Sequence, residues 1–227
     1  EYFHGFQKIA SPALHCSPFN PDSRVVVHPA DWIMLQLLCE RDAFTKEALF
    51  ATLLAKTNPA MEKASLIRTN EFKQTYEARG ESLADTVVDV ALDSLSRPYD
   101  RAHPRGKNYI QHYQESAIKN YSAGMWNRNE EGQNDLVFVR LELDDLWQVG
   151  NYRIGPNSFG ERVKEPLIET RHPLTPELQK QFDTMCKDYN IPPLNACPTL
   201  REYQASIRQS MESLYNGHNV IKPRDFV

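Results

Sequence analysis

Four short segments of the chain carry residue types that can take part in chemistry. They are an aromatic-His-Gly run (Tyr2–Gly5), a tyrosine-bearing stretch (Tyr109–Tyr121), a β-prone stretch with acidic residues near its end (Leu136–Leu143), and a Ser-Phe-Gly run followed by two glutamates (Ser158–Gly160, Glu165 and Glu169). Carboxylates stabilise positive charge, whereas imidazole and phenol groups form hydrogen bonds and stack on rings. These segments are therefore the candidates for a functional site.

The best-known catalytic motifs are missing from this sequence. It contains no Walker loop, Rossmann glycine fingerprint, HExxH, GxSxG or kinase motif. Its cysteines are Cys16, Cys39, Cys186 and Cys197. They have no CxxC spacing, which disfavours a structural zinc site, and we expect all of them to be reduced. Cys16 follows His15, but neighbours on an extended chain point to opposite faces, which disfavours a thiolate–imidazole pair.

Helices are expected to position most of these residues. Apolar residues at spacings of three and four predict helices over 31–42, 45–57, 59–79 and 82–97. A fifth helix is predicted from Tyr109 to Ala123, ended by Gly124 and followed by a polar loop over 127–134. Near the C-terminus, Thr175-Pro176 and the capping box Thr199–Glu202 each predict a helix start.

Strands are expected to be fewer and short. The clearest is Leu136–Leu143, in which Arg140 and Glu142 share one face and the more apolar residues share the other. Weaker strands are predicted over 2–6, 24–28, 150–155 and 166–170. Together these patterns predict one helix-rich α+β domain over residues 1–227, with a small mixed or antiparallel sheet. Within it we distinguish a helical subregion (30–97), a strand-containing subregion (134–170) and C-terminal helices (175–217).

Composition excludes several classes of protein. The chain has 227 residues, a formal charge of −4 and a mean hydropathy of −0.58. No apolar run is long enough to span a membrane, and the acidic balance argues against a protein that mainly binds nucleic acid. A basic loop over 96–107 is a local exception, and an anion or RNA site formed by its charges is a minor alternative to a simple solvated loop; those charges are Arg97, Arg101, Arg105 and Lys107.

Taken together, the four segments resemble the mono-ADP-ribosyltransferase superfamily. In the branch that uses a His-Tyr-Glu set, an early strand carries an aromatic-His-Gly motif, which Tyr2–Gly5 matches. The tyrosine would come from the stretch Ser116–Tyr121, and the glutamate would be Glu169 or Glu165. The arginine-ADP-riboxanase effectors also have a Val- and Phe-rich strand before a Phe-Gly pair, to which Leu136–Leu143 and Phe159-Gly160 are similar.

The resemblance implies NAD as co-substrate and a role for each residue. Breaking the nicotinamide–ribose bond passes through an oxocarbenium-like state, which Glu169 or Glu165 would stabilise. His4 would hydrogen-bond the ribose and the backbone of Gly5 would hold the nicotinamide amide. An aromatic ring would stack on the ligand and a guanidinium would pair with the pyrophosphate; the candidates are Tyr113, Tyr121 and Phe159 for the ring, and Arg140, Arg101 and Arg105 for the charge.

Two functions of different classes follow. The first is NAD-dependent ADP-ribosyl transfer to a side chain of a protein acceptor, by a soluble bacterial effector or toxin domain that is secreted into a host cell or cytoplasmic. The second is a non-catalytic interaction module whose helical bundle, 30–97, docks a partner protein through an amphipathic face. The first predicts that His4, an aromatic ring and a glutamate face one cleft. The second predicts an exposed apolar patch on the helices.

Overall fold

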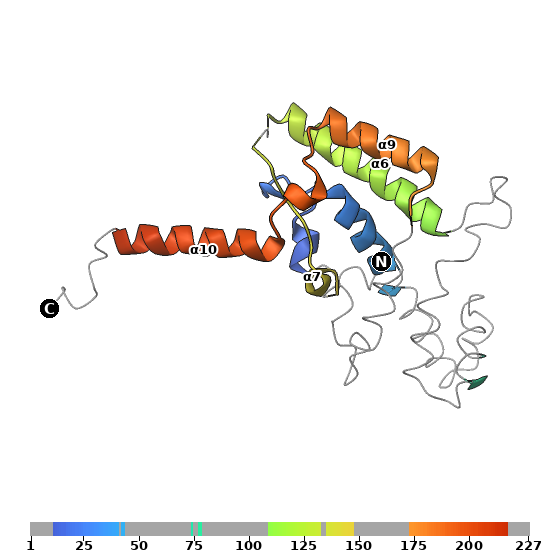
Figure 1. Ribbon diagram of the computed structural model, residues 1–227, viewed down its shortest axis with the longest axis horizontal. Coiled ribbons are helices and arrows are strands. Elements are labelled where there is room, and N and C mark those ends of the chain that lie inside the picture. Colours follow the sequence, from blue (N-terminus) through green and yellow to red (C-terminus); the bar gives the residue numbers. More distant parts are fainter. Residues whose placement is uncertain are drawn as a thin grey trace, which may run out of the picture.

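The computed structural model describes residues 11–40, 42–43, 74, 77–78, 109–132, 135–147 and 173–217. Within these ranges helices dominate and two short strands pair, so the fold is broadly α+β. Three helices whose ends are described are α6 (Tyr109–Glu130), α9 (Pro176–Asp188) and α10 (Leu200–Gly217). Figure 1 shows α6 and α9 packed side by side and α10 extending away from the other elements. No helix within the described ranges is long and apolar enough to cross a membrane.

The sheet consists of β1 (Val25–Val27) and β2 (Val137–Val139), which pair in parallel with Val26 opposite Phe138. The expectation of a mixed or antiparallel sheet is therefore wrong for the described residues. A parallel pair requires a long crossover between its strands, and more than a hundred residues, including α6, separate β1 from β2. One further parallel bridge joins Arg140 to Thr199, on the side of β2 away from β1.

A helix follows β1 directly and confirms the helix predicted over 31–42. Residues 29–40 are helical, so the helix begins two residues earlier than expected, at the proline whose missing N–H is not needed there. His28 is its N-cap: the Trp32 N–H donates to the His28 carbonyl at 2.9 Å, and the Ala30 N–H donates to Nδ1 of the ring at 3.2 Å. The ring's Nε2 lies 3.1 Å from the Pro192 carbonyl, which fixes the proton on that nitrogen.

The helix α6 continues through Gly124 to Glu130, so the predicted stop at Gly124 and the loop from 127 are wrong. Gly124 is present for packing, because a Cβ there would lie 2.9 Å from the Cβ of Pro18 and 3.1 Å from its backbone. The helix ends near Gly132, which has a positive φ of 72° and donates its N–H to Asn129. A glycine predicts a helix end only where the backbone needs that conformation.

Two polar side chains of α6 tie it to the N-terminal segments. Arg128 is 2% exposed and donates to the carbonyls of the loop over 17–23, among them Pro18 at 2.7 Å and Ser23 at 2.7 Å. Tyr121 is fully buried, and its hydroxyl donates to the Val27 carbonyl at 2.8 Å. The core forms around these contacts; its largest fully buried apolar side chains are Val26, Val27, Leu35, Met125 and Val139.

The strand predicted over 136–143 is confirmed only in its first half. After Arg140 the chain turns, and the short helix α7 (Leu143–Trp147) begins. The N–H of Glu142 donates to the Asp145 carboxylate at 2.9 Å, and the Asp145 N–H returns to the Glu142 carbonyl at 3.1 Å. This local capping competes successfully with β structure, so Arg140 and Glu142 do not share a strand face as expected.

Both C-terminal helix starts are confirmed. Thr175 caps α9 by accepting the Leu178 N–H at 3.3 Å, with Pro176 in the first turn. Thr199 and Glu202 form a reciprocal capping box at the start of α10, with distances of 2.7 and 3.0 Å. Between them lies a short 3₁₀ turn, η3 (Leu194–Ala196), and a similar turn, η1 (Pro12–His15), precedes β1.

Several sequence predictions lie outside the described residues. These are the helices over 45–57 and 82–97, the strands over 2–6, 150–155 and 166–170, and the basic loop over 96–107. Of the helix predicted over 59–79, the structure describes Gln74, Glu77 and Ala78, which are helical. The strand predicted over 24–28 is confirmed as β1.

Candidate functional site

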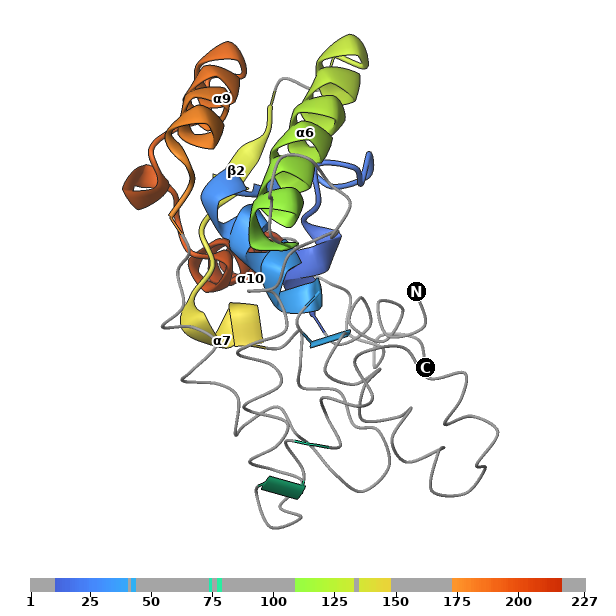
Figure 2. The ribbon, with the colours of Figure 1, turned by 90° about the vertical axis from the view of Figure 1, so that its right-hand side faces the viewer.

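Several charged side chains lie at the carboxyl edge of the parallel sheet, beside helix starts. β1 leads into the helix over 29–40, β2 leads into α7, and the bridge at Thr199 leads into α10. Ligands of parallel α/β sheets bind at this kind of edge. Figure 2 shows β2 lying between α6 and α9, with α7 beyond its carboxyl end.

The carboxylates at this edge serve the backbone. Asp31 is 9% exposed and accepts the Leu141 N–H at 2.7 Å. Glu202 accepts the Thr199 N–H, and this hydrogen bond, together with one from the Thr199 side chain, lowers the pKa of Glu202. Burial raises the pKa of Asp145, which accepts the Glu142 N–H. These acids hold chain segments and helix starts in place.

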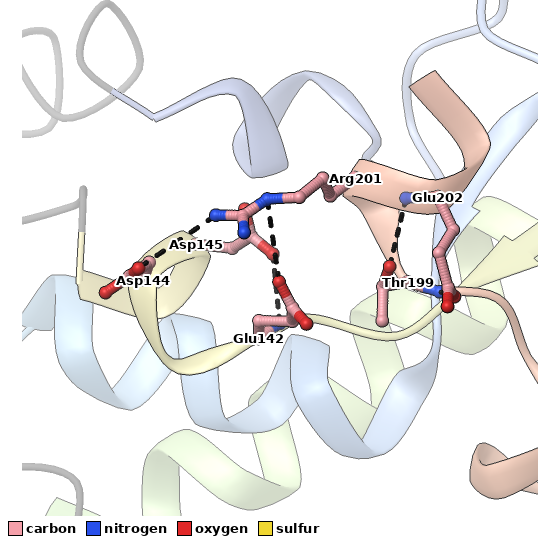
Figure 3. Close-up of polar contacts among 6 residues, drawn as sticks. All are labelled: Glu142, Asp144, Asp145, Thr199, Arg201 and Glu202. Atoms are coloured by element: carbon pink, nitrogen blue, oxygen red, sulfur yellow. Dashed lines mark hydrogen bonds and ion pairs between the residues drawn. The ribbon is translucent and has the colours of Figure 1, made fainter. Parts of the chain in front are cut away.

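Arg201, in the first turn of α10, forms ion pairs with residues at the start of α7. Its guanidinium lies 3.7 Å from Glu142 and 4.0 Å from Asp144 (Figure 3). All three side chains are well exposed, so these ion pairs stabilise the fold by little, about 0–1 kcal/mol each. Within the described residues, no group of three or more His, Cys, Asp and Glu side chains could hold a metal ion.

Three of the predicted site residues are described, and each occupies a different environment. Tyr113 is half-buried on α6, with its ring 6.1 Å from that of Tyr109. Tyr121 lies in the core, where burial raises its pKa, so the hydroxyl stays protonated and donates to Val27. Arg140 is half-buried at the end of β2, and its Nε donates to the Cys197 carbonyl at 3.2 Å.

The other predicted site residues lie outside the described residues. They are His4, Gly5, Phe159, Glu165 and Glu169, together with Arg101 and Arg105 of the basic loop. Whether a glutamate, the histidine and an aromatic ring face one cleft therefore stays a prediction.

All the thiols of the chain are free and poorly suited to nucleophilic chemistry. Burial, with a smaller contribution from Asp145, raises the pKa of Cys16 to about 11. Burial likewise raises the pKa of Cys186 to about 11 and raises the pKa values of Cys39 and Cys197. A thiol with such a pKa is protonated at neutral pH and reacts slowly.

A groove of about 650 Å³ lies beside β2, with Val137 and Phe138 in its lining; we call it the β2 groove. The last turns of α6 contribute Met125 and Asn129 to the lining, and the end of α9 contributes Asp188. Sequence patterns did not indicate this groove, because its lining comes from segments far apart in the chain. A second cavity, of about 220 Å³, lies between the helix over 29–40, α7 and α9 and has a mainly apolar lining.

The helix α10 has a row of apolar residues that becomes more exposed toward its C-terminal end. We define the α10 stripe as Tyr203, Ile207 and Met211. Leu200 at its base is 3% exposed, and Tyr203 is half-buried. Farther along, Ile207 is 44% and Met211 is 51% exposed. Their spacing of four residues places them on one helix face. This spacing was visible in the sequence, but their exposure was not.

Comparison with known proteins adds no relative: no family model, no curated protein and no solved structure matches this chain. The functional argument therefore depends on the residues themselves.

Proposed function

We propose that this protein is a protein-interaction module that inserts the α10 stripe into an apolar groove of a partner protein. One observation carries the proposal. Every residue from Gln204 to Ser213 is exposed, although α10 has apolar residues on one face. Figure 1 shows this helix standing clear of the other described elements.

A helix with an uncovered apolar face gains little stability from tertiary contacts. Helices of about 12–15 residues or fewer are marginal in water without tertiary contacts, and α10, with 18 residues, is only a little longer. The anchored base of α10 and its capping box provide nucleation, but Ile207 and Met211 in the outer turns stay 44% and 51% exposed. Among the described residues, the other exposed large apolar side chains are Phe19 and Trp126, which lie outside α10. Two anchors one turn apart match the helix-in-groove mode of recognition.

A groove of another protein accounts for α10 better than a second copy of this chain. A coiled coil needs apolar heptads sustained over about three to four repeats, and α10 has 18 residues. If Tyr203 and Ile207 occupy positions d and a of a heptad, the next d position is Ser210, which would place a polar residue in the seam of a helix pair. A groove that surrounds the stripe requires no such repeat.

NAD-dependent ADP-ribosyl transfer to a protein acceptor is the second function that we retain. What supports it is the resemblance of Tyr2–Gly5, the tyrosine-bearing stretch and the glutamate segment to the transferase motifs. It is compatible with the interaction module, because a transferase that modifies a protein must also bind that protein.

The experiment places a photo-crosslinking amino acid at one position of α10 at a time, in the full chain, in extracts of the cells in which the protein acts. We expect Ile207 and Met211 to crosslink to one protein, and Ala205 and Gln209, on other faces, to fail. The crosslinked protein is then purified and titrated against wild type and Ile207→Glu. A loss of affinity of tenfold or more is expected for Ile207→Glu, with Gln209→Glu as the matched control.

Three outcomes would contradict the proposal. Crosslinking that is equal from all faces of α10 would show contact without a defined stripe. Crosslinking only to other copies of this chain would assign the stripe to self-association. Equal affinity of the purified partner for wild type and Ile207→Glu would place the contact elsewhere.

A further inference from the structure

The hydrogen-bond pattern of β2 leaves one of its edges open. On the β1 side, the Val137 N–H donates to Arg24 at 2.9 Å and the Val139 carbonyl accepts from His28 at 2.8 Å. Backbone groups of successive residues in a strand point to opposite edges, so the N–H and carbonyl of Phe138 point away from β1. No partner for these two groups is recorded within the described residues.

The same edge is already paired two residues farther along the chain, at Arg140. The Arg140 N–H donates to the Pro198 carbonyl at 2.9 Å, and the Arg140 carbonyl accepts the Leu200 N–H at 3.0 Å. The chain before Pro198 turns aside through η3 and does not continue the pairing to Phe138. The β2 groove, of about 650 Å³, lies between β2 and this chain segment, since its lining includes Phe138 on one side and Ala196 and Cys197 on the other.

We propose that the β2 groove binds an extended polypeptide segment of another protein, which adds as a strand to the open edge of β2. The Phe138 N–H would supply a backbone hydrogen bond, and the segment would lie along the edge of β2 ahead of the place where Pro198 and Leu200 pair with Arg140. Strand addition of this kind takes its affinity from main-chain hydrogen bonds and its selectivity from side-chain pockets.

The charge of the groove selects a basic segment. Asp188 is exposed and lines the groove, whose lining includes no lysine or arginine within the described residues. The C-terminal ends of α6 and α9 both border it. A helix C-terminus carries partial negative charge and favours cations. A lysine or arginine beside Asp188 is therefore the side chain that this site prefers.

This site is independent of the α10 stripe, because its occupant is an extended segment and its lining includes no residue of α10. A failure of one proposal leaves the other standing. The two proposals are separated experimentally, since Ile207→Glu should not affect the β2 groove.

The test selects random eight-residue peptides from a phage-displayed library on the immobilised full chain, with counter-selection on Phe138→Pro. Proline at 138 removes the N–H that points away from β1 and leaves the hydrogen bonds between β2 and β1 in place. Prolines are tolerated at such edge positions. We expect β-prone peptides with a lysine or arginine. Phe138→Pro should weaken their binding at least tenfold, and Phe138→Leu less than threefold. Asp188→Asn should weaken it more than its control Asp183→Asn, on the same helix.

Amide hydrogen exchange keeps the test valid if Phe138→Pro fails to fold. The selected peptide, added to wild type, should slow exchange of the Phe138 amide at least tenfold. The proposal is overturned if the library yields no peptide that protects this amide. It is also overturned if peptides bind wild type and a folded Phe138→Pro equally, or if acidic peptides are selected instead of basic ones.

Discussion

Buried polar side chains in this protein mainly hold backbone groups in place. Arg128, His28, Asp31 and Tyr121 are all at least nine-tenths buried, and each makes a hydrogen bond to the backbone of a segment far away in the sequence or of its own helix start. Residue type alone suggested that Tyr121 could bind a ligand ring. Sequence could not show that its ring fills the core, because burial depends on contacts with distant segments.

Replacing Arg128 should strongly destabilise the fold. Arg128→Met keeps much of the volume but leaves the carbonyls of Pro18 and Ser23 without their donor. Hydrogen bonds to charged groups contribute about 1.5–3 kcal/mol each, and unsatisfied buried carbonyls cost more, so we expect a loss of about 3 kcal/mol. Urea unfolding followed by circular dichroism measures it. The free energy of unfolding of Arg208→Met, on exposed α10, should stay within about 0.5 kcal/mol of wild type. Equal losses of stability in the two variants would show that the hydrogen bonds of Arg128 do not stabilise the fold.

His28 should make stability depend on pH. Burial lowers its pKa below the usual 6.5, and the hydrogen bond to Pro192 only partly offsets this. The unfolded chain then binds a proton more readily than the folded one. The contribution of His28 to the free energy of unfolding is fully present above pH 6.5. It is lost as the pH falls toward the lowered pKa of the folded state.

Urea unfolding at several pH values between 5.5 and 7.5 tests this effect. The free energy of unfolding of wild type should fall as the pH drops through this range. His28→Asn, which keeps an N-cap but does not titrate, should show a shallower fall. Parallel curves for the two proteins would show that His28 is not the group responsible.

The transferase prediction is tested at the two glutamates. Under it, either Glu169→Gln or Glu165→Gln should lower the release of nicotinamide from NAD about a hundredfold or more, because the positive charge of the transition state would lose its carboxylate. The melting temperature should stay at the wild-type value. Nicotinamide release from wild type that neither substitution changes would remove both residues from the reaction.

At the scale of elements, local signals in the sequence predicted helix starts well. Thr175 and Thr199 each cap a helix as their neighbours indicated, because capping requires residues only a few positions apart. The strand over 136–143 failed for the same reason: the capping contact between Glu142 and Asp145 is stronger locally than β-propensity. Strand direction could not be predicted, because it depends on the long connection between β1 and β2.

Gly124 looks like a helix end in the sequence, but its role depends on close packing against a distant segment of the chain. Gly124→Ala should destabilise the protein by about 1–2 kcal/mol, because overpacking costs more than the gain in helix propensity returns. The clash would be with Pro18, 2.9 Å from the added Cβ. The double variant with Pro18→Ala should recover part of the loss in urea unfolding. Stabilisation by Gly124→Ala alone would disprove the close contact.

At the scale of the whole molecule, the described chain consists of a packed body and an exposed helix. The sheet, the helix over 29–40, α6 and α9 share one core, whereas α10 leaves it after Tyr203. The sequence predicted α10 as a helix, but it could not predict that the body stops short of covering Ile207 and Met211. The candidate sites, the α10 stripe and the β2 groove, follow from this arrangement.

Amide hydrogen exchange along α10 tests the central claim most directly. In the isolated protein, amides from Gln204 to Ser213 should exchange far faster than those of α6, because these residues are exposed. Adding the crosslinked partner should slow them at least tenfold, with the largest effect near Ile207 and Met211. Strong protection of these amides in the isolated protein would contradict the account, because the stripe would then already be covered.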